Sequence, residues 1–290
     1  SVNNDNRLPL LVKGKRLKGG KVSISDNISS QFISALLMIG PYTENGISIS
    51  LQADQVSMPY IRMTIELMKR AGARMKQSES GISVEPGTYE PSTIEVERDW
   101  SSASYFFEWV LFNPELEIDL PGLSLDSVQG DAAIVNLFQK LGVSAIENNG
   151  GISIQKNAEH KVNELDFLEI PDMAQSFAVA AAGMKKKIKL RGLQTLKVKE
   201  TDRIAALKSE LLKVGIECST TDNTLEITGF RDINREISIE TFRDHRMAMA
   251  FAPLVSKFGE IQIKDPGVVG KSFPDYWKQV SKLGVEILKT

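Results

Sequence analysis

Residues 199–203 (Lys-Glu-Thr-Asp-Arg) place two cations around a carboxylate in one short stretch. An apolar, strand-like run precedes them, and apolar residues at helical spacing follow until Gly215. Thr201 is therefore the predicted N-cap, with Arg203 in the first helical turn. A cation there opposes the helix dipole at a cost of roughly a few tenths of a kcal/mol, unless an anion lies nearby. The pattern favours an anion site in which Glu200 transfers protons, and a solvated, salt-bridged helix start is the alternative.

The composition is that of an ordinary globular chain. It has 290 residues, of which 42% are hydrophobic and 25% charged, enough for two domains with a real core. The net charge of -2 argues against a general polyanion binder, so any anion site must be local. The single cysteine cannot form an internal disulfide, which indicates a reducing compartment. No apolar run has membrane-spanning length and no secretory signal is visible, so a cytoplasmic protein is expected.

A short phrase recurs four times along the chain, with a period of about 70 residues that marks a duplicated structural unit. In each copy a helical pattern ends near a lysine, and a glycine follows at Gly72, Gly142, Gly215 or Gly284. Glycine in this place predicts a left-handed helix stop. Each unit is interpreted as helix, strand, helix, strand, strand. The first strands are predicted at residues 46–51, 116–120, 187–193 and 260–264, and later strands at residues 81–84, 151–154 and 224–227.

Two further stretches bear on the organisation of the chain. Residues 11–25 are basic, contain glycines and alternate in polarity, which predicts a solvated edge hairpin. Residues 92–100 are polar and lie between the first two units, so they are the predicted domain boundary.

Helix starts in equivalent units carry the candidate binding residues. Predicted starts lie at residues 29–32, 101–104, 172–175 and 244–247. Ser57 and Ser272 each precede a proline by two positions, as helix caps do. Taken singly, the cations near these starts are plain surface charges. Taken together, they predict an anionic ligand with more than one charged group. The four cations are Lys199, Arg203, Arg246 and Lys271.

The carboxylates Asp172 and Glu200 are predicted to share this site. Among so many cations their pKa values should depend on the bound ligand, and such a pair can remove one proton and deliver another. For Asp172, a plain N-cap is the alternative. His245 is a candidate hydrogen-bond donor or proton shuttle, with a purely structural role as the alternative, and Cys218 is interpreted as a core residue. The sequence has no cysteine or histidine cluster, P-loop or dinucleotide motif, so no metal site is expected.

These motifs resemble the EPSP synthase family, whose members join phosphoenolpyruvate to shikimate 3-phosphate in chorismate and aromatic amino acid biosynthesis. The matching segments run in family order along nearly the whole chain. They are residues 29–32 (SSQF), 57–60 (SMPY), 101–105 (SSASY), 129–131 (QGD), 171–172 (PD), 199–203 (KETDR), 244–249 (DHRMAM) and 271–276 (KSFPDY).

The resemblance implies an α/β fold of repeated βαβαββ units, the inside-out α/β barrel of the enolpyruvyl transferases, in two domains that close on substrates. Residues 1–98 would be part of an N-terminal domain, with its last unit and edge strands. Residues 99–290 would be a C-terminal domain of three units. The family's first portion, with a Lys-Ser pair and an Asn-x-Gly-Thr loop, has no counterpart here, so a chain truncated at its N-terminus is expected.

The resemblance also implies roles for individual residues. Shikimate 3-phosphate would be bound by Ser29, Ser30, Gln31, Ser57, Tyr60, Asp172, Thr195 and Lys199. Phosphoenolpyruvate would be bound by Gln31, Arg203, Arg246 and Lys271, with His245 in support. Asp172 would accept the proton of the attacking 5-hydroxyl, and Glu200 would protonate the enol methylene. Thr195 departs from the asparagine often found at its position. No cofactor is implied, glyphosate is expected to compete with phosphoenolpyruvate, and a monomer is expected.

Two alternatives remain open. The sister transferase that uses UDP-N-acetylglucosamine has the same repeat, although the motifs at residues 29–32, 199–203 and 244–249 favour EPSP synthase. The other alternative is an inactive substrate-binding fragment of EPSP synthase.

Overall fold

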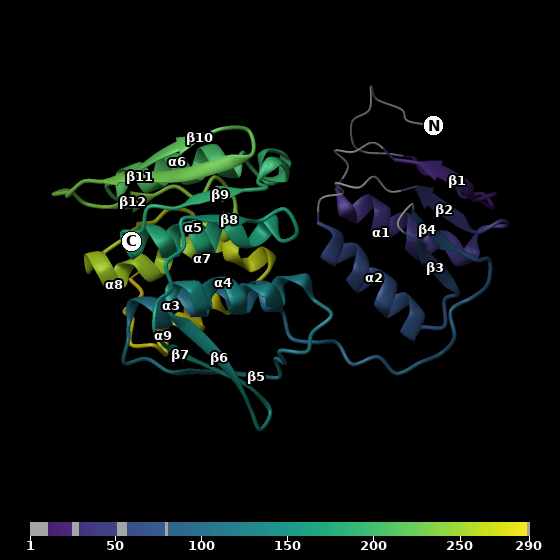
Figure 1. The fold of residues 1–290 in the computed structure, drawn as a ribbon, viewed down its shortest axis with the longest axis horizontal. Coiled ribbons are helices and arrows are strands. Elements are labelled where there is room, and N and C mark those ends of the chain that lie inside the picture. Colours follow the sequence, from purple (N-terminus) through teal and green to yellow (C-terminus); the bar gives the residue numbers. More distant parts are fainter. Residues whose placement is uncertain (1–10, 25–28, 51–56, 79–80, 289–290) are drawn as a thin grey trace. The chain divides into compact units, whose positions relative to one another are not determined.

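The computed structural model describes residues 11–24, 29–50, 57–78 and 81–288, and its ribbon is drawn in Figure 1. The chain divides into two compact units, Ser1–Glu95 and Val96–Thr290. The division falls within the polar stretch at residues 92–100.

In the first unit two helices cover one four-stranded sheet. The elements are β1 (Gly20–Ser23), α1 (Ser30–Ile39), β2 (Ile47–Ser50), α2 (Met58–Arg70), β3 (Met75–Ser78) and β4 (Gly81–Val84), with a 3-10 turn η1 (Gly40–Tyr42). The strand order is β1-β2-β4-β3, with β1 parallel to β2 and the other pairs antiparallel. Alternate residues of β2 are buried, as expected for a strand with one face on a core. Ile33 and Leu37 of α1 and Ile61 and Ile65 of α2 complete that core.

The predicted edge hairpin is wrong within the described residues 11–24. Only β1 forms there, and it lies at the sheet edge parallel to β2. The backbone just before β1 instead accepts hydrogen bonds from the turn before β2. Glu44 N donates to Leu17 O (3.0 Å), and Asn45 N donates to Lys18 O (2.9 Å). A parallel partner needs no hairpin, and the alternating pattern alone could not distinguish the two pairings.

The second unit has three sheets around a group of buried helices. Its strands are β5 (Ile118–Pro121), β6 (Val143–Asn148), β7 (Gly151–Lys156), β8 (Glu164–Asp166), β9 (Lys189–Arg191), β10 (Ile216–Thr220), β11 (Thr224–Phe230), β12 (Ser238–Ile239) and β13 (Gln262–Ile263). Its helices are α3 (Trp100–Phe112), α4 (Ile134–Leu141), α5 (Ala174–Gly183), α6 (Arg203–Lys213), α7 (His245–Phe251), α8 (Val255–Phe258) and α9 (Tyr276–Ser281). Short 3-10 turns are η2 (Gly130–Ala133), η3 (Pro171–Met173), η4 (Gln194–Val198), η5 (Ala252–Leu254) and η6 (Pro266–Lys271).

The sheets of this unit lie outside its central helices. The strand orders are β5-β7-β6, β10-β11-β9-β8 and β12-β13. Figure 1 shows α5 and α7 between the sheet of β8–β11 and the sheet of β5–β7. Almost every residue of α3, α5 and α7 is buried, which explains why these helices are apolar or small on all sides.

The repeat predicted from the sequence is confirmed. A first helix, a strand, a second helix and an antiparallel strand pair recur as α1-β2-α2-β3-β4, α3-β5-α4-β6-β7 and α5-β9-α6-β10-β11. Gly72, Gly142, Gly215 and Gly284 all have left-handed backbone angles, with φ of 86°, 89°, 80° and 87°. The α/β class with helices inside and sheets outside is therefore confirmed. The sheets stay separate, and none closes into a barrel among the described strands.

A carboxylic acid lies in the core of the second unit. Glu108, on α3, has no exposed surface, and neither of its carboxyl oxygens has a hydrogen-bond partner among the described residues. Burial raises the pKa of Glu108 well above its ordinary value. The folded protein therefore holds a proton there that the unfolded chain releases at neutral pH.

Because the folded pKa is raised, stability is expected to fall as the pH rises above the unfolded value. Glu108→Gln removes this proton linkage. Its melting temperature should exceed that of the wild type by about 2–4 °C or more at pH 8, the shift that about 1 kcal/mol gives in a domain of this size. The difference should shrink toward pH 5. Thermal unfolding at several pH values measures it, with Glu115→Gln on the exposed chain after α3 as the control. A pH-independent difference would contradict the assignment.

Candidate active site

Four helix starts meet in the second unit. The guanidinium of Arg246, in the first turn of α7, donates to Asp172 O (3.1 Å) in η3, just before α5. It also lies 3.5 Å from Ser101 Oγ, in the first turn of α3. Arg203, the first residue of α6, contacts the same Asp172. The helix starts at α3, α5, α6 and α7 therefore face one cluster of charged groups.

Arg203 is the centre of this cluster, and its side chain is only 2% exposed. Its Nε donates to Asp244 Oδ2 (2.7 Å), its Nη1 to Asp172 Oδ1 (3.0 Å) and its Nη2 to Glu200 Oε2 (2.7 Å). Three carboxylates thus surround one buried guanidinium. The cation that opposes the helix dipole is compensated by side chains of the protein itself.

Asp172 is the carboxylate with the most cationic neighbours. Its oxygens lie 3.0 Å from Arg203 Nη1, 3.3 Å from Lys199 Nζ and 3.5 Å from Arg246 Nη2. Burial would raise the pKa of Asp172, but the charges of Arg246, Lys199 and Arg203 outweigh it and hold the pKa well below its usual range. Asp172 is therefore ionised at neutral pH, in the form that accepts a proton.

Glu200 bridges two of the predicted cations. One oxygen accepts from Arg203, and the other accepts a hydrogen bond from Lys271 Nζ. Burial opposes ionisation of Glu200, yet the hydrogen bond from Lys271 and the charge of Arg203 lower its pKa to about 2. Its side chain is 24% exposed, and that of Lys271 is 57% exposed. This edge of the cluster is the part most open to a ligand.

His245 and Thr195 are also placed in the second unit. His245 is buried beside Asp244, with Nδ1 3.6 Å from Asp244 Oδ1, too far for a hydrogen bond. Burial and then the charge of Arg246 lower the pKa of His245, so the imidazole is neutral at neutral pH. This favours a hydrogen-bonding role over acid catalysis. Thr195 lies in η4, and its buried Oγ1 has no hydrogen-bond partner among the residues that the structure describes.

Three predicted caps differ in the structure. Asp202, not Thr201, is the N-cap of α6, and its carboxylate accepts from Ala205 N (3.1 Å). Ser57 does precede α2, but it adopts a left-handed conformation with φ 63° and makes no side-chain cap bond. Ser272 does not cap α9, which follows Asp275. Aspartate is a stronger N-cap than threonine, which explains the first difference.

The predicted residues of the first unit gather at one end of its helix layer. Strands β1, β2 and β3 run in the same direction, and α1 and α2 each connect two of them, so the two helices start at the same end of the unit. The helices are joined by Ser34 Oγ of α1, which lies 2.8 Å from Thr64 Oγ1 of α2. Ser29 caps α1 by accepting from Gln31 N (3.4 Å). Ser30 and Ser57 are buried, Gln31 is exposed and Tyr60 is half-buried.

Sequence reasoning missed three residues of the cluster. Asp244 has no exposed surface, holds Arg203, and also caps α7 by accepting from Arg246 N (2.9 Å). Ser101 donates to Asp131, which is 4% exposed. All three lie inside motifs that the sequence analysis quoted. Only membership of these motifs could have indicated them, because a sequence does not distinguish a helix cap from the partner of a buried ion pair.

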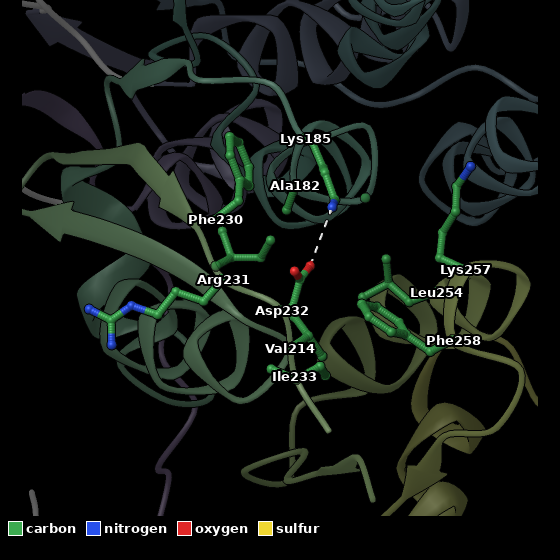
Figure 2. Close-up of a pocket in the computed structure, with 12 residues that line it drawn as sticks. Ala182, Lys185, Val214, Phe230, Arg231, Asp232, Ile233, Leu254, Lys257 and Phe258 are labelled. Carbon is green, nitrogen blue, oxygen red and sulfur yellow. Dashed lines mark ion pairs between the residues drawn. The ribbon is translucent and has the colours of Figure 1, made fainter. Parts of the chain in front are cut away.

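A pocket of about 280 Å³ lies away from this cluster, where α5, α6 and α8 end (Figure 2). It is lined by Ala182, Gly183, Lys185, Val214, Ile216, Phe230, Arg231, Asp232, Ile233, Leu254, Lys257 and Phe258. Figure 2 shows Lys185 and Asp232 pointing toward one another, and their charged atoms are 4.0 Å apart. None of the predicted site residues lines this pocket. Its lining is apolar apart from an exposed charged rim.

Cys218 is half-buried on β10 and packs against the core, as predicted. Burial raises its pKa to about 12, so the reactive thiolate is scarce at neutral pH. Alkylation by iodoacetamide at pH 8 should be at least about tenfold slower than that of free cysteine. Mass spectrometry over time measures the rate, and urea-unfolded protein is the control. Alkylation as fast in the folded as in the unfolded protein would show an exposed, activated thiol.

Metal-binding clusters and membrane-spanning helices are both absent from the described residues. No group of three or more His, Cys, Asp or Glu side chains among them could hold a metal ion. Within the same residues, no helix has both the length and the apolar character needed to cross a membrane.

The repeated α/β units with inner helices, and the cluster of cations and carboxylates at the helix starts, agree with the enolpyruvyl transferase fold that the sequence motifs imply. The chain belongs to the EPSP synthase family: the family model described as EPSP synthase (3-phosphoshikimate 1-carboxyvinyltransferase) matches residues 1–280. A Bacteroides fragilis 3-phosphoshikimate 1-carboxyvinyltransferase is 42% identical over 99% of this chain and 71% of its own length. The same-named protein of Tolumonas auensis is 33% identical over 97% of this chain and 66% of its own length.

Solved structures agree with the fold. EPSP synthase from Acinetobacter baumannii matches with a TM-score of 0.72 and 21% identity, over 97% of this chain and 66% of that one. The enolpyruvyl transferase NikO from Streptomyces tendae matches with a TM-score of 0.68 and 14% identity, over 96% and 66%. At these identities the likeness concerns the fold alone. The chain thus spans about two thirds of the length of the solved proteins it resembles.

Proposed function

We propose that this chain provides the proton-transfer groups for moving the carboxyvinyl group of phosphoenolpyruvate to the 5-hydroxyl of shikimate 3-phosphate. The products are 5-enolpyruvylshikimate 3-phosphate and phosphate. One observation carries the proposal: Asp172 and Glu200 contact the same guanidinium, that of Arg203. Two carboxylates in one cationic cluster supply the base and the acid that the reaction needs.

The cations would bind the substrates by exchanging partners. Phosphoenolpyruvate carries a phosphate and a carboxylate, and Lys271 and Arg203 now contact Glu200. The anionic groups of the substrate would take over these cations together with Arg246, and Gln31 would complete the site. Lys199, which contacts Asp172, would bind shikimate 3-phosphate together with Thr195. Ser29, Ser30, Ser57 and Tyr60 would hold its phosphate from the first unit.

This exchange also gives each carboxylate its role. Asp172 is ionised and accepts the proton of the 5-hydroxyl as its oxygen attacks C2 of phosphoenolpyruvate. Glu200, with its pKa of about 2, is a poor acid while Lys271 and Arg203 contact it. Once substrate anions neutralise these cations, the pKa of Glu200 rises and it can protonate C3. Phosphate then leaves C2, and the ionised Glu200 takes a proton back from C3, which yields the enol ether.

The proposal is tested by phosphate release from phosphoenolpyruvate with shikimate 3-phosphate or UDP-N-acetylglucosamine as acceptor. The assay uses this chain and a longer form extended at its N-terminus to the length of its relatives (the extended protein). Release by the extended protein with shikimate 3-phosphate alone would support the proposal. Release with the nucleotide sugar, or no release with either acceptor, would contradict it. If only the extended protein is active, the present chain is a substrate-binding fragment.

Lys271→Met in the extended protein is expected to raise the KM for phosphoenolpyruvate by at least about tenfold, the loss of one charge-assisted hydrogen bond. The KM for shikimate 3-phosphate should change little, because Glu200 is the only described residue of the cluster that Lys271 contacts. Steady-state kinetics with each substrate varied separately measures the difference. Lys278→Met on exposed α9 is the matched control. Equal changes in both KM values would contradict this role.

Three further expectations belong to the proposal. The unit Ser1–Glu95 would be part of the N-terminal domain, residues 1–98, and Val96–Thr290 would contain the C-terminal domain, residues 99–290. Glyphosate would compete with phosphoenolpyruvate at Lys271, Arg203 and Arg246. The protein would act as a cytoplasmic monomer.

A further inference from the structure

Asp131 is connected to Arg246, a predicted phosphoenolpyruvate-binding residue, through one intervening side chain. Its carboxylate accepts a hydrogen bond from Ser101 Oγ, and the same oxygen of Ser101 lies 3.5 Å from Arg246 Nη2. A serine hydroxyl has one proton and two lone pairs. Because the proton is directed to Asp131, Ser101 can face the guanidinium only as an acceptor.

The loop that carries Asp131 is fixed to the start of α3. The side-chain amide of Gln129 donates to Arg98 O (2.7 Å), and its oxygen accepts from Trp100 N (3.0 Å). Glu97 accepts from Val128 N (3.2 Å) in the same loop. These bonds run in both directions between the loop and the chain before α3. Asp131 and Ser101 are therefore held at a fixed separation.

Arg246 is held from its other side by Asp172. Its Nη1 donates to Asp172 O (3.1 Å), and its Nη2 lies 3.5 Å from Asp172 Oδ2. The side chain is 11% exposed, so few water molecules can replace a lost partner. The plane of the guanidinium is thus set between η3 on one side and the α3 start on the other. Removing the second support would weaken the restraint on rotation of the group.

We propose that Asp131 is a positioning residue that orients Arg246 through Ser101 and thereby sets the affinity for phosphoenolpyruvate. The inference rests on the proposed function for the role of Arg246. A carboxylate acceptor polarises the serine hydroxyl, which makes its oxygen a better acceptor for the guanidinium. An orienting group of this kind lowers the cost of fixing Arg246 when the substrate arrives.

The kinetic test compares Asp131→Asn and Ser101→Ala in the extended protein. Each variant should raise the KM for phosphoenolpyruvate about three- to tenfold and leave the KM for shikimate 3-phosphate and the melting temperature nearly unchanged. The double variant should be no worse than the worse single variant, because both act on one chain of bonds. Asp126→Asn, an exposed aspartate in the preceding loop, is the control and should match the wild type. Parallel losses in both KM values with a lower melting temperature would indicate a merely structural residue and overturn the inference.

A second measurement needs no turnover. Rotation of the Arg246 guanidinium is measured by NMR exchange between its Nη protons, assigned by their loss in Arg246→Lys. Rotation should be at least about threefold faster in Asp131→Asn and Ser101→Ala than in the wild type or Asp126→Asn. Unchanged rotation would overturn the inference whatever the kinetics. A wild-type extended protein without transferase activity would contradict the proposed function, while the rotation rates would still decide the positioning role.

Discussion

Asp172→Asn in the extended protein is expected to lower kcat by a factor of about 10²–10⁴, the usual contribution of a positioned acid or base. Asparagine keeps the size of the side chain and one hydrogen-bond acceptor for Arg203, but it cannot take the proton of the attacking hydroxyl. The free energy of unfolding should change far less than the activation free energy of the reaction. Asp222→Asn, at an exposed ion pair with Lys197, is the control.

Glu200→Gln should lower kcat to a similar degree for a different reason, and an isotope experiment separates the two carboxylates. In the proposed mechanism, Glu200 adds a proton to C3 and forms a methyl group. Reversal in D₂O therefore leaves deuterium in phosphoenolpyruvate. Glu200→Gln should abolish this incorporation, which mass spectrometry of recovered phosphoenolpyruvate measures. Normal incorporation would assign the acid to another group, and normal turnover by Asp172→Asn would remove the proposed base.

Asp244→Ala is expected to destabilise the chain by about 3–5 kcal/mol, the cost of leaving a buried charge without its main partner. Asp244 makes two contacts with the buried guanidinium of Arg203, at 2.7 Å and 3.4 Å. It also caps α7, which adds about 1 kcal/mol to the loss. Urea unfolding followed by circular dichroism measures the change.

Two variants show whether the buried ion pair is responsible. Asp275→Ala removes a carboxylate before α9 that makes no side-chain cap bond, and it should cost less than about 0.5 kcal/mol. Arg203→Met combined with Asp244→Leu removes both charges and should recover much of the loss, since apolar replacements of buried pairs are often tolerated. If the double variant loses as much stability as the two single variants together, the packing of the two side chains matters more than their charges.

Much of the fold could be predicted from the repeat. Four glycines with the same role fixed the helix ends, because few other residues adopt a left-handed backbone without strain. The parallel pairing of β1 could not be predicted, because an edge strand and a hairpin strand have the same alternation. The lengths of strands such as β13, with only two residues paired, depend on neighbouring strands and are not visible in one segment.

The sequence predicted which residues form the site better than it predicted which of them contact one another. The charges of Lys199, Arg203 and Lys271 were visible, and they suggested cations awaiting an anionic ligand. The structure shows instead that Asp172, Glu200 and Asp244 already contact these cations. Asp244 lies 41 positions from Arg203, so no local pattern could connect the two. Long-range partners of this kind follow only from the packing of α6 and α7 against α5.

Asp244 connects the backbone of α7 to the ionic cluster. The same carboxylate accepts from the amide of Arg246 and from the guanidinium of Arg203. Opening the first turn of α7 would therefore loosen Arg203, and displacing Arg203 would expose that amide to solvent. The hydrogen-exchange rate of one backbone amide, that of Arg246, thus becomes a reporter of whether the cluster is intact. It can be followed without substrates, inhibitors or turnover.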